Sequence, residues 1–220
     1  MYTQFNKYKF QKEPVIENDF WTEETARLIC FETNQWNTDD NFNFTMAAKP
    51  YLQAMSTTLL HPFKLQHNFI DSESSLYNSV QNTMTSQDPL IYLVFHGFPG
   101  ALIYSDHEGS GLDEVIHPFI SDTEVRRIIY IGACSIFGKS DGEFLAKRLL
   151  EKSKCEAVIG YTENAGWYNS NFTEMLFISR FYNSPNPFYE LDEIYDSVLN
   201  DFAPARKIGL KMFSRKSIGN

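Results

Sequence analysis

Two apolar runs constrain the fold of this chain most strongly, because each one ends on a reactive side chain. Leu90–Gly97 reads LIYLVFHG and ends on a histidine and a glycine, and Arg127–Ser135 reads RIIYIGACS and ends on a small turn with a cysteine. Near-continuous apolar runs of this length are typical of strands in the middle of a parallel sheet. The carboxyl ends of parallel strands share one edge, where ligands bind in open sheets. We therefore expect His96 and Cys134 to meet at that edge.

Strand-like and helix-like segments alternate around these two runs. Further strands are predicted over Leu28–Phe31, Phe63–Ile70 and Glu156–Tyr161. Helices are predicted over Pro50–Leu60, from Asp71 or Ser72 through about Ser86, over Leu112–Ile120, from Ser140 or Asp141 through Ser153, from Trp167 to about Tyr182 and over Tyr189–Ala203, before a basic tail that includes Lys207–Lys216. This alternation predicts an α/β fold built from parallel units with right-handed crossovers.

Length and composition limit the domain count and the class of partner. The chain has 220 residues with 43% hydrophobic content, which fits one domain, predicted over residues 26–220, after a polar and aromatic N-terminal extension over residues 1–25. A net charge of −9 argues against nucleic acid as a partner. No apolar run is long enough for a membrane helix, and no signal sequence is evident. Three cysteines form no disulfide framework, so we expect a cytoplasmic protein with Cys30 and Cys155 in the core.

The residues around Cys134 suit nucleophilic chemistry. A cysteine attacks as the thiolate, and a nearby imidazole such as that of His96 can take its proton. Small residues flank Cys134 and allow a sharp turn, and the backbone N–H groups of Gly97 and Cys134 could form an oxyanion hole. The competing interpretation is an inert buried cysteine, because free cysteine is among the most buried residue types.

The order of these residues separates the known families of hydrolase. None of the five histidines follows Cys134, whereas papain-like peptidases and α/β-hydrolases place their histidine after the nucleophile. The α/β-hydrolase turn also has glycine two residues after the nucleophile, where this chain has Ile136. Both families are therefore excluded. The order of this chain, with the histidine before the cysteine, is the order found in caspases.

At this point the chain resembles the caspase-like cysteine peptidases. The segments HGFPGALIYSD, GLDEV, IYIGACSIF and AVIGYTENAGW are most similar to the bacterial CHAT-type branch, over about Arg27 to Tyr182. The resemblance implies a caspase-hemoglobinase-like three-layer α/β/α sandwich with a mainly parallel central sheet, with His96 as general base or acid and Cys134 as nucleophile. Residues 132–136 read Gly-Ala-Cys-Ser-Ile where caspases carry Gln-Ala-Cys-Arg-Gly, so aspartate specificity is not implied.

The resemblance also implies a specificity pocket near the ends of the first strand, the cysteine strand and the strand after it. The side chains expected there are three carboxylates and two aromatic walls: Glu32, Asp106, Glu163, Tyr161 and Trp167. An acidic pocket would prefer arginine or lysine at the cleaved position. The competing interpretation is that these carboxylates are ordinary solvated loop residues.

Taken together, these features predict a cysteine endopeptidase, a hydrolase that acts on a protein or peptide in regulated bacterial proteolysis or defence. We expect no cofactor and no metal, and a regulatory protein partner if the activity is controlled. The first alternative is a catalytically inactive CHAT-like module for protein interaction. A doubly wound nucleotide- or small-molecule-binding domain ranks last, because the sequence holds neither glycine-rich phosphate motif.

Overall fold

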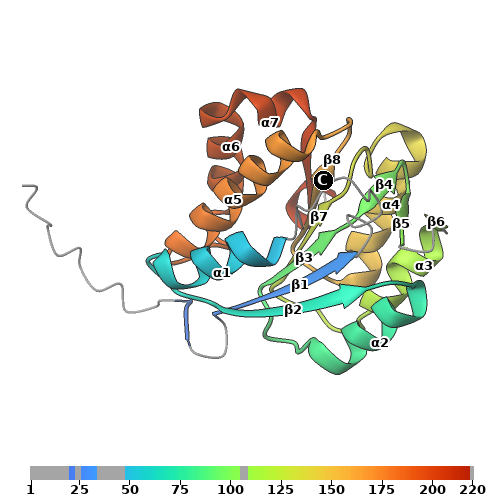
Figure 1. Cartoon of the computed structure of the whole chain (residues 1–220), viewed down its shortest axis with the longest axis horizontal. Coiled ribbons are helices and arrows are strands. Elements are labelled where there is room, and N and C mark those ends of the chain that lie inside the picture. The colour runs from blue at the N-terminus through green and yellow to red at the C-terminus, as the bar shows by residue number, and fades with distance from the viewer. Residues whose placement is uncertain (1–19, 23–25, 34–47, 105–108, 219–220) are drawn as a thin grey trace, which may run out of the picture.

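The fold is a three-layer α/β/α sandwich around a six-stranded, mainly parallel sheet (Figure 1), as the sequence predicts. The computed structural model describes residues 20–22, 26–33, 48–104 and 109–218. Across the sheet the strands follow the order β2-β1-β3-β7-β8-β9. Their bounds are Lys64–Ile70 for β2, Arg27–Thr33 for β1, Leu90–Val94 for β3, Ile128–Gly132 for β7, Ala157–Tyr161 for β8 and Leu210–Ser214 for β9. All pairs are parallel except β8 with β9.

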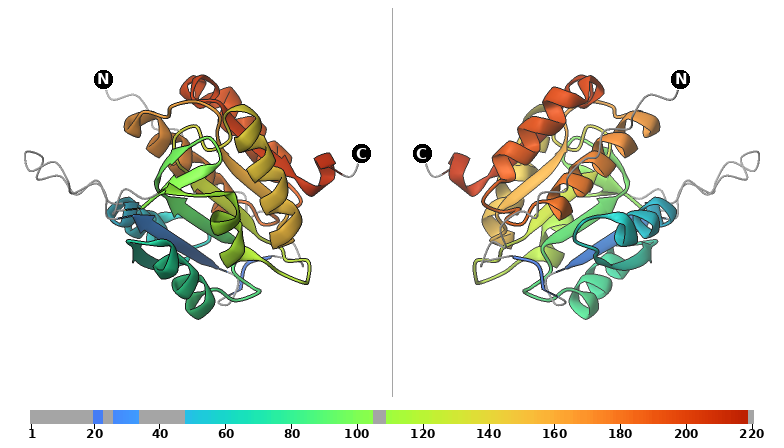
Figure 2. Two further views of the ribbon diagram at one scale, coloured as in Figure 1. Left: turned by 90° about the vertical axis from the view of Figure 1, so that its right-hand side faces the viewer. Right: turned by 90° about the vertical axis from the view of Figure 1, so that its left-hand side faces the viewer.

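Helices cover both faces of the sheet, which explains why its central strands are apolar throughout. One face carries α1 (Ala48–Thr58), α5 (Trp167–Asn183), α6 (Leu191–Asp201) and α7 (Ala203–Lys207), and the other carries α2 (Glu73–Thr83), α3 (Leu112–Ile116), a 3₁₀ turn (His117–Phe119) and α4 (Lys139–Ser153) (Figure 2). Alternate strand residues therefore enter two separate cores: Ile91 and Ile129 belong to one, and Leu90 and Ile128 to the other. None of the helices described is long and apolar enough to cross a membrane.

A small antiparallel sheet holds His96. It consists of β4 (His96–Phe98), β5 (Ala101–Ile103) and β6 (Gly109–Ser110). The sequence predicts one strand from Leu90 to Gly97, but the central strand β3 ends at Val94. After β4 the chain turns, and Gly100 in this turn has a φ of 77° that L side chains rarely adopt. The chain reverses there, and His96 pairs with Ile103.

The C-terminal region differs from its prediction. Instead of one helix and a basic tail, α6 ends at Asp201, α7 begins at Ala203 with Pro204 in its first turn, and β9 then adds an antiparallel strand to β8. The sequence does not predict this strand, because Lys211 makes the segment resemble a basic tail. In the structure the charge of Lys211 is paired, since its ammonium is 2.5 Å from the Glu143 carboxylate. A short α8 (Arg215–Ile218) follows β9.

Helix starts were predicted with mixed success. Ser72 is the N-cap of α2, and its hydroxyl accepts a hydrogen bond from the Ser75 N–H. The start of α4 was wrong, because its N-cap is Gly138 rather than Ser140 or Asp141. A Cβ atom at residue 138 would lie 2.8 Å from the Thr162 carbonyl oxygen. Glycine is therefore needed at this N-cap because the chain packs closely against the end of β8.

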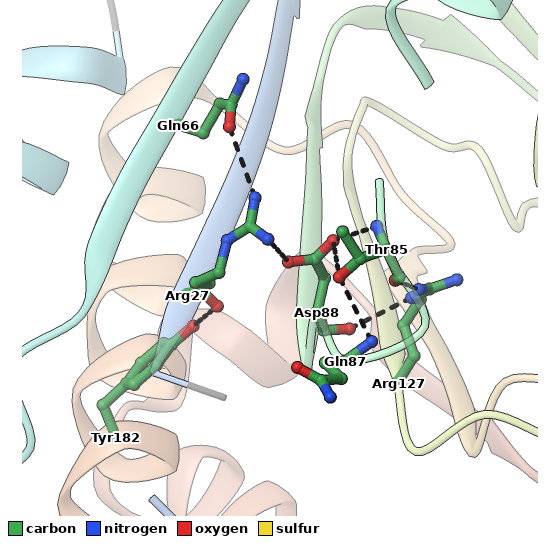
Figure 3. Close-up of polar contacts among 7 residues, drawn as sticks. All are labelled: Arg27, Gln66, Thr85, Gln87, Asp88, Arg127 and Tyr182. Atoms are coloured by element: carbon green, nitrogen blue, oxygen red, sulfur yellow. Dashed lines mark hydrogen bonds and ion pairs between the residues drawn. The ribbon is translucent and has the colours of Figure 1, made fainter. Parts of the chain in front are cut away.

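A buried charge cluster joins the N-terminal ends of β1, β3 and β7 (Figure 3). The fully buried Asp88 carboxylate lies 3.1 Å from the Arg27 guanidinium and accepts hydrogen bonds from the N–H (2.5 Å) and hydroxyl (3.1 Å) of Thr85. Arg127, also buried, donates from Nε to the Asp88 carbonyl oxygen at 3.1 Å. The cluster fixes three strands at the edge of the sheet opposite His96 and Cys134.

We expect Asp88→Asn to lower the free energy of unfolding by about 3 kcal/mol, because it removes the fully buried carboxylate that is the counter-ion of the partly buried Arg27 guanidinium. Urea unfolding followed by circular dichroism measures this. The matched control is Asp122→Asn at an exposed position, with an expected change below about 0.5 kcal/mol. Equal stability of the two variants would contradict the proposed role of the cluster.

Candidate active site

Cys134 and His96 line the same cavity, at the carboxyl ends of β7 and β3. The cavity has a volume of about 210 Å³. The β3–β7 register pairs Val94 with Gly132, and His96 and Cys134 each follow two residues later. Both side chains are partly exposed. A thiol and an imidazole, each just beyond the end of one of two neighbouring strands, thus share one opening to solvent.

Hydrogen bonds hold the turn that carries Cys134. Ser135, the next residue, has a φ of 51°, a conformation that costs energy for a residue other than glycine. Its N–H donates to the Glu163 carbonyl at 3.0 Å, and its hydroxyl donates to the Asn164 side chain at 2.8 Å. The Cys134 thiol donates to the Ala165 carbonyl at 3.3 Å. The loop after β8 therefore fixes both the backbone and the sulfur of this turn.

Gly97 packs directly against the same turn. A Cβ atom at residue 97 would lie 2.9 Å from the Ala133 Cβ and 3.0 Å from the Cys134 carbonyl oxygen. Real Cβ atoms essentially never approach so closely, so glycine is needed for this contact. The segment after His96 and the turn at Cys134 form one packed unit.

The state of His96 suits proton acceptance. Burial lowers the pKa of the His96 imidazole from its ordinary value of 6.5, because partial desolvation disfavours the imidazolium ion. The imidazole is therefore neutral at pH 7 and has a ring nitrogen that can accept a proton.

Glu174 is a cavity residue that the sequence did not reveal. It lies on α5, is only 2% exposed, and accepts hydrogen bonds from the hydroxyls of Tyr92 and Tyr161. Burial raises the pKa of the Glu174 carboxyl to about 7. A Cβ atom at Gly132 would lie 2.7 Å from the Glu174 Oε1 atom. The glycine before the cysteine turn therefore makes room for a carboxyl group.

The side chains predicted for a specificity pocket are only partly brought together. Tyr161 and Trp167 line the cavity. Glu163 is exposed and is not among the residues that line it. Asp106 lies outside the described residues.

Glu32 is not in the cavity either, because its carboxylate is fully buried elsewhere. It accepts a hydrogen bond from the Ala48 N–H at the start of α1 (2.8 Å) and lies 2.6 Å from the His67 Nε2 atom. The donor atoms of Cys30, Glu32 and His67 lie within 4.8 Å of one another. These are ligand types that zinc accepts, although Glu32 and His67 already pair with each other.

Comparison with known proteins identifies the fold. No family model matches the chain, and no curated protein matches it in sequence. Among solved structures, caspase-1 from Spodoptera frugiperda superposes with a TM-score of 0.53 at 13% identity, over 90% of this chain and 89% of that one. A secreted C11 cysteine protease from Bacteroides thetaiotaomicron, solved with an irreversible peptide inhibitor, gives 0.50 at 12% identity, over 79% of this chain and 58% of that one.

The chain therefore has the caspase-like fold. Identities of 12% and 13% show architecture alone, so function must be argued from the side chains at the site.

We expect Gly97→Ala to destabilise the protein by about 1–3 kcal/mol, because the added methyl group overlaps the turn at Cys134. Urea unfolding measures the loss. Gly109→Ala in the same small sheet is the matched control, since its nearest contact would be an ordinary 3.8 Å. If Gly97→Ala were no more harmful than Gly109→Ala, the close contact would not matter for stability.

Proposed function

We propose that this protein is a cysteine endopeptidase that uses a dyad of His96 and Cys134. The observation that carries the proposal is their convergence on one solvent-open cavity at the carboxyl edge of the sheet. The fold supports it, because structural neighbours include a caspase and a C11 cysteine protease. Peptide or protein is the proposed substrate.

The reaction would run through a thioester. The Cys134 thiol gives its proton to the neutral His96 imidazole, and the thiolate attacks the carbonyl carbon of the peptide. The imidazolium then gives that proton to the leaving amine as the C–N bond breaks. Water attacks the thioester and loses a proton to His96, and the departing thiolate takes it back. The net change is addition of water to one peptide bond.

The proposed oxyanion hole consists of the backbone N–H groups of Gly97 and Cys134. Their packed arrangement supports it, since the Cys134 carbonyl oxygen would lie 3.0 Å from a Cβ atom at Gly97. Preorganised donors stabilise charge that develops in the transition state without reorganising during the reaction.

The remaining parts of the proposal rest on the motifs quoted above and, for the location, on the cysteine content. These are membership of the CHAT-type branch, a bacterial role in regulated proteolysis or defence, a cytoplasmic location and control by a protein partner. The alternative is a catalytically inactive module for protein interaction, and a test of Cys134 distinguishes it from a peptidase.

We expect Cys134→Ala and His96→Ala each to reduce peptide cleavage by at least about 100-fold, because each removes one member of the proton-transfer pair. A fluorogenic peptide-library assay measures this, and a peptide with a thiol-reactive group should label Cys134 in the native protein. The matched controls are Cys155→Ala, a cysteine outside the cavity, and His117→Ala, an exposed histidine.

Those controls should keep their activity. A native protein that neither cleaves any peptide nor labels at Cys134 would favour the inactive interaction module instead.

The pH dependence should follow the His96 shift. Burial lowers the pKa of this imidazole below 6.5, so the neutral base persists into more acidic solution and is lost only below that pH. We expect the acidic limb of kcat/KM for an uncharged peptide to have its midpoint below pH 6.5. A midpoint clearly above that value would contradict a desolvated His96 as the base.

A further inference from the structure

One face of α5 forms a wall of the cavity beside Cys134. Trp167, Asn171 and Glu174 all line the cavity, and their spacing of three to four residues places them on the same side of the helix. A volume of about 210 Å³ lies below the range of about 300–1,000 Å³ that is typical of sites for drug-sized ligands and cofactors. The space therefore suits a single long side chain.

Two polar groups of this wall, the Glu174 carboxyl and the Asn171 side-chain oxygen, can accept more hydrogen bonds than the described residues donate to them. The Glu174 carboxyl accepts one bond from Tyr92 and one from Tyr161, and an ionised carboxylate has about four acceptor sites. The Asn171 Oδ1 atom is buried and has no hydrogen-bond partner among the described residues. A buried acceptor without a donor costs free energy, so both groups point to a ligand that supplies N–H donors.

The charge of the cavity is also one-sided. Glu174 is the one acidic residue among the described residues that line the cavity, and none of these residues is an arginine or a lysine. A cation in the cavity would favour the ionised form of this carboxyl, whose pKa burial raises to about 7. The indole of Trp167 adds an aromatic surface, which attracts cations.

We propose that this cavity binds the side chain on the N-terminal side of the cleaved bond, that Glu174 and Asn171 bind it, and that arginine is preferred to lysine. This inference rests on the proposed function. We expect arginine to be preferred because Glu174 and Asn171 each supply a hydrogen-bond acceptor and the Trp167 indole supplies an aromatic surface. A planar guanidinium with five donors can bond to both acceptors and stack on an aromatic ring, whereas an ammonium is a compact point charge with three donors.

The recognition group proposed here differs from those expected from the sequence. Glu32 and Glu163 do not line the cavity, so the same preference for a basic residue would depend on a helix residue instead. Separate variants of Glu163 and Glu174 distinguish the two assignments.

The first experiment compares fluorogenic peptides that differ only in the residue before the cleaved bond, at pH 8, where Glu174 is mostly ionised. The residues are arginine, lysine and citrulline, which has the shape of arginine without its charge. We expect kcat/KM for arginine to exceed that for citrulline by about 10- to 100-fold, the range for charge-assisted hydrogen bonds, with lysine between them. Cys134→Ala should abolish cleavage of all three peptides.

The second experiment measures the arginine-to-citrulline ratio of kcat/KM in variants. A ratio within one variant cancels changes in the dyad itself, which affect both peptides. Glu174→Gln should reduce the ratio to about 1–3. Citrulline can also donate to Asn171, so the readout for Asn171→Ala is the arginine-to-lysine ratio, which should fall toward about 1 for the loss of the second acceptor. Glu163→Gln removes an exposed carboxylate outside the cavity, and its ratio should equal that of the native protein.

The outcomes separate the two proposals. Cleavage that depends on Cys134 with equal rates for arginine and citrulline overturns the pocket assignment and leaves the peptidase intact. No cleavage of any peptide overturns the peptidase. A ratio lost in Glu163→Gln but kept in Glu174→Gln would assign recognition to the loop after β8. If Glu174→Gln fails to fold, as thermal unfolding will show, Asn171→Ala decides the outcome, and an unchanged arginine-to-lysine ratio there overturns the proposal.

Discussion

The parallel pairing of β3 with β7 is the constraint on which the candidate site depends. From Leu90 opposite Ile128 to Val94 opposite Gly132, the two strands run in register and end together. A shift by one residue would turn every side chain to the opposite face, and it would separate Cys134 from His96. Burial on both faces makes such a shift costly, because the strands contribute alternately to two apolar cores.

The two edges of this sheet have opposite chemistry. At the N-terminal edge, the charged side chains of Arg27 and Arg127 join β1, β3 and β7 through Asp88 (Figure 3). At the carboxyl edge, Gly97, Gly132 and the small residues beside Cys134 let backbone segments approach closely and leave a cavity. Charge pairs therefore hold the strands together at one edge, while the other edge keeps an open cavity.

Sequence patterns were sufficient where the cause is local or periodic. The apolar runs predicted the central strands, and the strand ends predicted that His96 and Cys134 lie at one edge. Patterns failed where the cause is distant in sequence. The partner of Glu32 is His67 on the neighbouring strand β2, and nothing near Glu32 indicates that pairing. Glu174 was missed because it lies on an aromatic-rich helix face, and only the packed fold shows that this face lines the cavity.

Gly132 connects these observations. From the sequence, its small size suggested a sharp turn, but Gly132 is not among the described residues with a positive φ. The structure gives another reason, which is that the Glu174 carboxyl and the Tyr92 ring occupy the space where its side chain would lie. Where this chain has glycine, the caspases that it resembles carry glutamine, whose side chain would compete with Glu174 for that space. Gly132 on the cysteine strand therefore makes room for the carboxyl group that α5 supplies to the cavity.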